Sequence, residues 1–206
     1  MRNNRTSRLA IGVAIAILVV VAATATAASA GGNSPALAKA KLRDANGQEV
    51  GVVRFHRANH EITARVKLTL PADSAEFHGF HIHANNPDPT TQIRPGCDPA
   101  TGFTSVGGHW DVGGHSHGAH TGDLPILVRD SEGEVEMKFV VDRFTSGDLI
   151  GHAVVVHVGP DNFGNVPLGP AANQYTDNGT AYNGTGGTAA TGNAGARYAC
   201  GVLEKG

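Results

Sequence analysis

Histidines and one carboxylate, residue types that bind transition metals, gather in the middle of this 206-residue chain. Most lie between residues 78 and 123, in a stretch rich in glycine, and one more follows an apolar run at 153–156. Neutral imidazoles in such number suit copper or zinc, whereas a packed core avoids them. The sequence therefore predicts a metal centre, whose candidate members are His81, His83, His109, His115, His117, His120, Asp123 and His157.

Four of these histidines have a placement that suits copper. His81 and His83 are two residues apart, so on a strand both rings project from the same face, about 7 Å apart at their bases. His157 lies in a third apolar strand, where a titratable ring has no obvious structural task. Together with His109 they offer the imidazoles of a tetragonal copper site.

The loop after His109 suits zinc instead. It supplies His115 or His117, then His120, and finally the carboxylate of Asp123. Nitrogen ligands with one carboxylate oxygen match tetrahedral zinc. Because an imidazole ring has two nitrogens, a shared ring could join the two sites.

Strands separated by turns must position these residues. Apolar alternation predicts eight short strands, at 36–43, 49–57, 61–70, 77–84, 124–129, 135–141, 152–158 and 196–203. Asn46-Gly47 predicts a hairpin between the first two, because both positions tolerate positive φ. With no persuasive helix, this pattern favours an all-β fold, an antiparallel sandwich or barrel. Two long irregular segments, 85–114 and 159–195, are expected to be functional loops.

The first thirty residues have the pattern of a signal peptide, 1–30. Arginines at positions 2, 5 and 8 precede an apolar run, and the small residues 28–30 offer a cleavage site before Gly31. We therefore expect an exported protein: secreted, periplasmic or associated with the cell envelope. The alternative is an uncleaved membrane anchor, since the run 9–28 is nearly long enough to cross a bilayer.

The remainder predicts one domain, 36–206, with little charge bias. The chain has 16 Lys and Arg against 18 Asp and Glu, so nothing indicates a nucleic-acid partner or an anionic membrane surface. In an exported chain the two cysteines, Cys97 and Cys200, predict one disulfide. No apolar pattern in the sequence sets an oligomeric state.

Five segments resemble the secreted copper/zinc superoxide dismutase family. They are Gly-Phe-His-Ile-His at 79–83, Gly-Gly-His at 107–109, His-Thr-Gly-Asp-Leu at 120–124, Val-Val-His at 155–157, and the run 192–202. They stand in the family's order and cover nearly all of 36–204. The resemblance implies an eight-stranded antiparallel Greek-key β-barrel. It also implies an enzyme that converts superoxide to dioxygen and hydrogen peroxide by one-electron cycling of copper.

The resemblance assigns roles to individual residues. It implies copper on His81, His83, His109 and His157. It implies zinc on His109, His117, His120 and Asp123. It further implies His109 as a bridging ligand and proton carrier, Arg197 as a guide for superoxide, Asp161 as a link between the two metal shells, and the Cys97–Cys200 disulfide.

Two departures from the family keep alternatives open. Only thirteen residues separate His109 from Asp123, which is short for a zinc-binding relative, so a copper-only enzyme is the alternative, and His115 competes with His117. Segment 163–196 has no Lys, Arg or Glu, so we expect electrostatic steering of superoxide to be weak. A copper carrier or buffer without turnover is the other functional hypothesis. Arg197 favours the enzyme, because a carrier does not need it.

Overall fold

The computed structural model describes residues 35–58, 61–145, 147–164 and 188–206. The predicted signal peptide lies outside these residues, as does most of the second long loop. Within the described part of the chain, no helix has the length and apolar character needed to cross a membrane.

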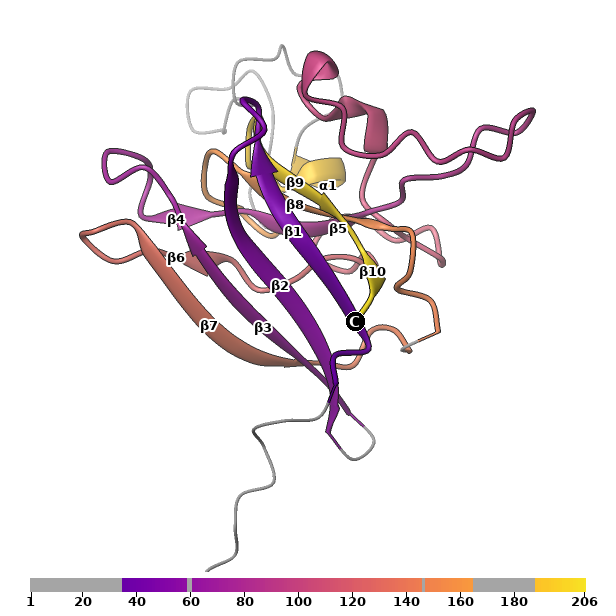
Figure 1. Cartoon of the computed structure of the whole chain (residues 1–206), viewed down its shortest axis with the longest axis horizontal. Helices are drawn as coiled ribbons and strands as arrows, with labels where there is room; N and C mark the ends of the chain where they lie inside the picture. Colours follow the sequence, from indigo (N-terminus) through magenta and orange to yellow (C-terminus); the bar gives the residue numbers. More distant parts are fainter. Residues whose placement is uncertain (1–34, 59–60, 146, 165–187) are drawn as a thin grey trace, which may run out of the picture. The chain divides into compact units, whose positions relative to one another are not determined.

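The fold is nearly all β and is built around one curled antiparallel sheet (Figure 1). Its strands are β1 (Ala38–Asp44), β2 (Glu49–Ala58), β3 (Glu61–Thr69), β5 (Phe80–His83), β7 (Glu134–Val141), β8 (Ala153–His157), β9 (Arg197–Val202) and β10 (Glu204–Lys205). They are ordered β5-β8-β9-β1-β2-β3-β7, with β10 added to β1. Neighbours that are distant in sequence require crossovers, as in a Greek key. The predicted antiparallel all-β fold is confirmed.

The remaining elements are short. Strands β4 (Phe77–His78) and β6 (Leu127–Val128) form a two-stranded sheet. The helical elements among the described residues are two 3₁₀ turns, Pro99–Thr101 and Thr104–Val106, and the single turn α1 (Thr188–Thr191).

Several predicted elements differ in detail from the structure; the strand expected at 124–129, for example, is reduced to Leu127–Val128. The strand expected at 77–84 divides at Gly79, where a Cβ atom would lie 2.5 Å from the Cβ of Ala194. At the first hairpin only Gly47 has positive φ, at 79°. Asp44 closes that turn, because its Oδ1 accepts hydrogen bonds from the N–H groups of Asn46 and Gln48. An aspartate-capped turn thus replaces the expected Asn-Gly geometry.

Strand alternation builds the core and also explains the metal-binding strand. Leu42, Phe55 and Val66 from three adjacent strands point into one buried cluster. Strand β5 is buried on both faces. Phe80 and Ile82 enter the core, so the alternate residues of β5 must point to the opposite face of the sheet, where loops cover them.

A disulfide fastens the first long loop over this outer face. Cys97 and Cys200 are bonded, with Cα atoms 5.6 Å apart, which confirms the predicted pairing. Beneath the loop a second apolar cluster joins Phe103 and Val106 to Val155 of β8. This layer holds the loop against β8 and β9, beside the end of β8 that carries His157.

Candidate metal centre

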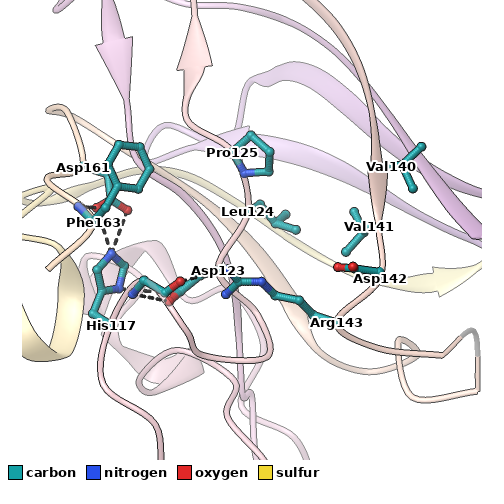
Figure 2. A pocket seen from close by; sticks show the side chains of 11 residues that line it. His117, Asp123, Leu124, Pro125, Val140, Val141, Asp142, Arg143, Asp161 and Phe163 are labelled. Carbon is teal, nitrogen blue, oxygen red and sulfur yellow. Dashed lines mark hydrogen bonds and ion pairs between the residues drawn. The ribbon is translucent and has the colours of Figure 1, made fainter. Parts of the chain in front are cut away.

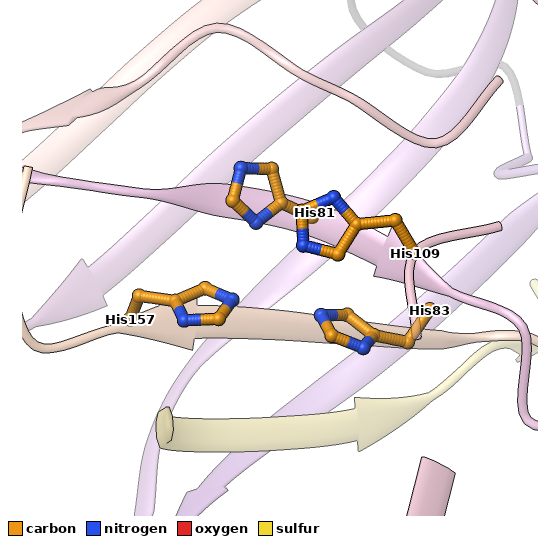
Figure 3. A group of neighbouring side chains, drawn as sticks. All are labelled: His81, His83, His109 and His157. Atoms are coloured by element: carbon orange, nitrogen blue, oxygen red, sulfur yellow. The ribbon is translucent and has the colours of Figure 1, made fainter. Parts of the chain in front are cut away.

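Four histidines converge on the outer face of the sheet (Figure 3). His81 and His83 come from β5, and His157 ends the neighbouring strand β8. His109 arrives from the loop and forms an isolated antiparallel bridge with His83. One ligand atom from each of the four lies within 4.8 Å of the others. The structure thus brings together the set predicted to bind copper.

Each of these four rings is anchored through one nitrogen and leaves the other without a partner. The anchored nitrogen of His81 contacts Asp161, and that of His109 contacts Asp123. Those of His83 and His157 contact the carbonyl oxygens of Gly107 and Gly195. The unpartnered nitrogens are His81 Nδ1 and the Nε2 atoms of His83, His109 and His157. Buried polar atoms normally have hydrogen-bond partners. Four orphaned nitrogens directed into one site, each oriented by its second nitrogen, fit a metal ion.

Burial keeps these rings in the form that binds metals. Removal from water lowers the pKa of His157 to about 3, and neighbouring histidines add to the effect. The pKa of His109 is also lowered to about 3, mainly by burial, although Asp123 opposes the shift. The pKa of His83 lies well below its usual value, again mainly because the ring is buried. The rings are therefore neutral at pH 7, and each can offer one nitrogen to a cation without losing a proton.

A second cluster shares His109. Its Nδ1 lies 2.9 Å from Asp123 Oδ1 and 3.3 Å from His117 Nδ1. His117 Nδ1 and His120 Nδ1 each lie 3.3 Å from a carboxylate oxygen of Asp123. The edge of a tetrahedron around zinc, with bonds of about 2.0–2.1 Å, is about 3.3 Å. Three nitrogens and one oxygen at these separations fit zinc.

The fourth member of this second cluster differs according to whether donors are chosen by their mutual distance or by the partner that each nitrogen contacts. The donors that lie within 4.8 Å of one another here are those of His81, His109, His117 and Asp123, a set without His120. However, His81 Nε2 is held by Asp161, whereas His120 Nδ1 is directed at Asp123. We therefore retain His120 as the fourth donor.

His115, the competitor of His117, lies outside both clusters. Its side chain is 52% exposed, and its Nδ1 is 2.7 Å from Asp111 Oδ1. Asp111 also accepts a hydrogen bond from the backbone N–H of His115. The pair closes a local turn in the loop, and His117 takes the inner position.

Asp161 links the two clusters. One carboxylate oxygen hydrogen-bonds His81 Nε2, and both lie within 3.0 Å of His117 Nε2. Burial alone would lower the pKa of His117, but the carboxylates of Asp123 and Asp161 raise it to about 9. Gly192 packs against this contact: a Cβ there would lie 2.0 Å from Asp161 Oδ1. Sequence reasoning did not identify this role of Gly192.

Arg197 lies at the edge of the four-histidine cluster. It begins β9 opposite His157. Its guanidinium donates hydrogen bonds to the carbonyl oxygens of Phe103 and Gly107. Its charge helps lower the pKa of His83, after burial and His109, and the pKa of His157, after burial, His81 and His109. The predicted guiding arginine therefore stands next to two of the predicted copper ligands.

Arg143, which sequence reasoning missed, clamps the loop of the second cluster. Two residues beyond β7, it reaches toward Asp123 beside a pocket of about 250 Å³ (Figure 2). Its Nη1 and Nη2 donate to the carbonyl oxygens of His120 and Gly118, both at 2.9 Å. Asp123 Oδ2 accepts the N–H groups of the same two residues. Between them, Arg143 and Asp123 thus hold the backbone carbonyl and the backbone N–H of both Gly118 and His120.

Comparison with known proteins agrees with this geometry. The sequence model of the copper/zinc superoxide dismutase family matches residues 49–203 of this chain. Superoxide dismutase [Cu-Zn] of Mycolicibacterium paratuberculosis is 33% identical over 173 residues, covering 80% of this chain and 73% of that protein. Superoxide dismutase [Cu-Zn] of Schizosaccharomyces pombe is 31% identical over 163 residues, covering 74% and 88%.

A solved structure extends the agreement to three dimensions. The copper/zinc superoxide dismutase from Brucella abortus superposes with a TM-score of 0.55 at 25% identity, covering 81% of this chain and 98% of its own. The matched residues 49–203 include both histidine clusters and both cysteines. Sequence, fold and site agree, and the chain belongs to the copper/zinc superoxide dismutase family.

Proposed function

We propose that the chain dismutates superoxide with copper held by His81, His83, His109 and His157. The observation that carries this assignment is the group of four buried ring nitrogens that lack partners and face one another. Copper would supply the one-electron cycling by which two superoxide ions and two protons become dioxygen and hydrogen peroxide.

The protein's own residues would orient the site and move a proton. His109 has Nδ1 in the second cluster and Nε2 in the first. Because Asp123 holds Nδ1, a proton carried by this ring would sit on Nε2, facing the substrate side. Zinc has no redox chemistry, so on His109, His117, His120 and Asp123 it would fix the bridging ring and the loop.

Arg197 would receive the anion. A guanidinium has five N–H donors and stays charged at any relevant pH. Bonds to Phe103 and Gly107 hold the group in place, and donors remain for superoxide. A copper buffer without turnover has no use for such a group beside the ligands, so this placement favours the enzyme.

Metal content and turnover of matched variants test the proposal. Replacing His157 with Ala should remove copper and abolish superoxide dismutation while circular dichroism retains the β spectrum. His115→Ala, at an exposed histidine outside both clusters, is the control and should keep copper, zinc and activity. Full activity of the His157 variant would refute the copper assignment.

We also propose that the mature protein is exported. The support is the leader pattern of residues 1–30 together with a disulfide, since such bonds persist mainly in oxidising compartments. The intact mass of protein recovered from outside the cytoplasm should correspond to a chain that begins near Gly31. A mass that includes the leader would favour the membrane anchor.

A further inference from the structure

The pocket beside Arg143 leads from solvent to the second metal cluster. Its volume is about 250 Å³, and the buried residues His117, Asp123 and Asp161 are part of its lining. Asp142, directly after β7, lines it as well, and its side chain extends toward Asp123 (Figure 2). A hydrated zinc ion takes up roughly 180 Å³, at about 30 Å³ for each of six water molecules. The pocket therefore has room for the ion together with its water.

The donors of the second cluster differ in their access to solvent. The side chains of Asp123 and His120 are 6% and 10% exposed, whereas those of His109 and His117 are 1% and 0% exposed. Of these four residues, only Asp123 and His117 line the pocket. An ion that arrives through the pocket would thus meet the Asp123 carboxylate before it meets the buried nitrogens.

The opposite approach, from the four-histidine cluster, is obstructed. The ring centroids of His81 and His109 are 4.0 Å apart, so an ion has no space to pass between the two rings. Arg197 stands beside that cluster, and its positive charge repels cations. Both sterics and charge therefore disfavour this approach for zinc.

The pocket has the opposite charge. Its lining carries the carboxylates of Asp123, Asp142 and Asp161 against the single guanidinium of Arg143, and the excess stays negative even when His117 carries a proton. Two backbone carbonyl oxygens hold the guanidinium. Among the described residues, the Asp142 side chain has no hydrogen-bond or ion-pair partner. A cleft with an excess of one charge raises the local concentration of the opposite ion, so this pocket attracts cations.

We propose that zinc enters and leaves the second cluster through this pocket, and that Asp142 is the first carboxylate to attract the ion. The inference rests on the proposed zinc site and adds the route by which that site fills. Neither Arg197 nor any member of the four-histidine cluster lines the pocket. Superoxide and zinc would therefore approach the linked clusters from different sides.

Two substitutions of Asp142 separate its charge from the width of the route. Asp142→Asn removes the charge at nearly constant size. It should slow zinc uptake by about threefold at an ionic strength of about 0.01 M and by less at about 0.15 M, because salt screens the attraction. Asp142→Trp also fills the mouth of the pocket. Relative to Asp142→Asn, it should slow both uptake and release by about tenfold and leave the zinc affinity nearly unchanged, because an obstacle on the path hinders both directions equally.

Stopped-flow measurements of zinc uptake by metal-free protein, and of zinc release from loaded protein to a chromogenic chelator, give these rates. The matched controls are Asp73→Asn and Asp73→Trp, which make the same changes at an exposed aspartate outside the pocket. Both controls should exchange zinc like wild type. Neither measurement uses dismutation, so a failure of the proposed enzyme activity would be seen separately.

Each contrary result overturns a defined part of the inference. If wild-type protein takes up no zinc, the second metal site is wrong and the route is wrong with it. If zinc binds but Asp142→Trp exchanges it as fast as Asp142→Asn, the ion uses another route. Slower release with unchanged uptake would mean that tryptophan stabilises bound zinc, which also excludes the route. Uptake by Asp142→Asn equal to that of wild type at low salt would remove the attracting role of Asp142.

Discussion

At the scale of single residues, the two metal clusters differ in how their histidines hold protons. The first cluster is desolvated, and its rings resist protonation because burial lowers their pKa values. In the second, His117 lies between Asp123 and Asp161, whose charges raise its pKa to about 9. In the metal-free protein a protonated His117 therefore supplies the positive charge that zinc would supply.

This difference predicts that zinc uptake, but not copper uptake, displaces a proton near neutral pH. The folded-state pKa of His117 exceeds the ordinary 6.5, so its protonation stabilises the metal-free fold fully below pH 6.5, and this contribution is lost as pH rises through about 9. Zinc must displace that proton, so apparent zinc affinity should rise up to about tenfold per pH unit below pH 9. Calorimetry of the copper-free protein in buffers of different ionisation enthalpy should show about one proton released at pH 7 as zinc binds. Zinc uptake without proton release would contradict this.

Arg143 permits a second prediction at this scale. Arg143→Ala should speed zinc release to a chromogenic chelator by about tenfold, near the lower end for groups that orient metal ligands, because the side chain is exposed. Copper content should not change. Arg143→Lys should release zinc at an intermediate rate, since a single ammonium does not match the two-carbonyl geometry.

The matched control for Arg143 is Arg43→Ala, at an exposed arginine in the first hairpin, and it should release zinc like wild type. The melting temperature of the metal-free Arg143→Ala protein should be close to that of wild type. Faster zinc release would then reflect weaker retention of zinc and not a less stable fold. If wild-type protein takes up no zinc, the second metal site is wrong. If it takes up zinc and Arg143→Ala retains it equally well, only the clamp is wrong.

At the scale of elements, the long loop 85–114 brings the disulfide into the site. Gly107 lies in this loop, and its carbonyl oxygen accepts hydrogen bonds from both His83 and Arg197. Phe103, which provides the other carbonyl for Arg197, packs against Cys200. The loop therefore positions one predicted copper ligand and the predicted guiding arginine together.

Replacing Cys97 and Cys200 with serine should affect both stability and turnover. The free energy of unfolding should fall by about 2–5 kcal/mol, because the bond closes a long loop in the unfolded chain. Activity should also fall, because the carbonyl groups that hold Arg197 would be less ordered. Denaturant melts and steady-state rates measure the two effects. A variant that keeps wild-type activity while losing stability would show that the loop holds Arg197 without the bond.

At the scale of the whole molecule, positive charge is concentrated away from the predicted superoxide site. Arg197 stands beside the copper cluster, whereas Lys39, Arg54, Arg65 and Lys138 lie on β1, β2, β3 and β7. Segment 163–196 has no Lys, Arg or Glu, and most of it lies outside the described residues. Guidance of superoxide would then rest mainly on Arg197 and on the metal itself.

The rate of dismutation should accordingly depend only weakly on ionic strength. Salt screens long-range steering by many charges, but it affects a partly buried group next to the reacting ion much less. Pulse radiolysis between about 0.01 and 0.15 M ionic strength, where the Debye length falls from about 30 to 8 Å, should show less than a threefold fall. A fall of an order of magnitude would indicate a larger guiding field.

Much of the site could be predicted from the sequence because its information is local. Alternation along a strand places His81 and His83 on one face and Phe80 and Ile82 on the other, whatever the partners of that strand. The histidine segments and their order along the chain were sufficient to show the resemblance to a known family. The antiparallel fold and the disulfide followed from similarly local patterns and from the number of cysteines.

Only the tertiary structure decided which distant residues meet. The choice of His117 over His115, the clamp by Arg143 and the pairing of Arg54 with Arg65 across two strands depend on loop conformation and strand register. A shift of one residue in register would turn a strand's cations toward the core, and no local pattern sets which cation faces which. The sequence thus determined the donors and the faces they occupy. The packing of strands and loops determined their partners, because long-range contacts are a property of the folded whole.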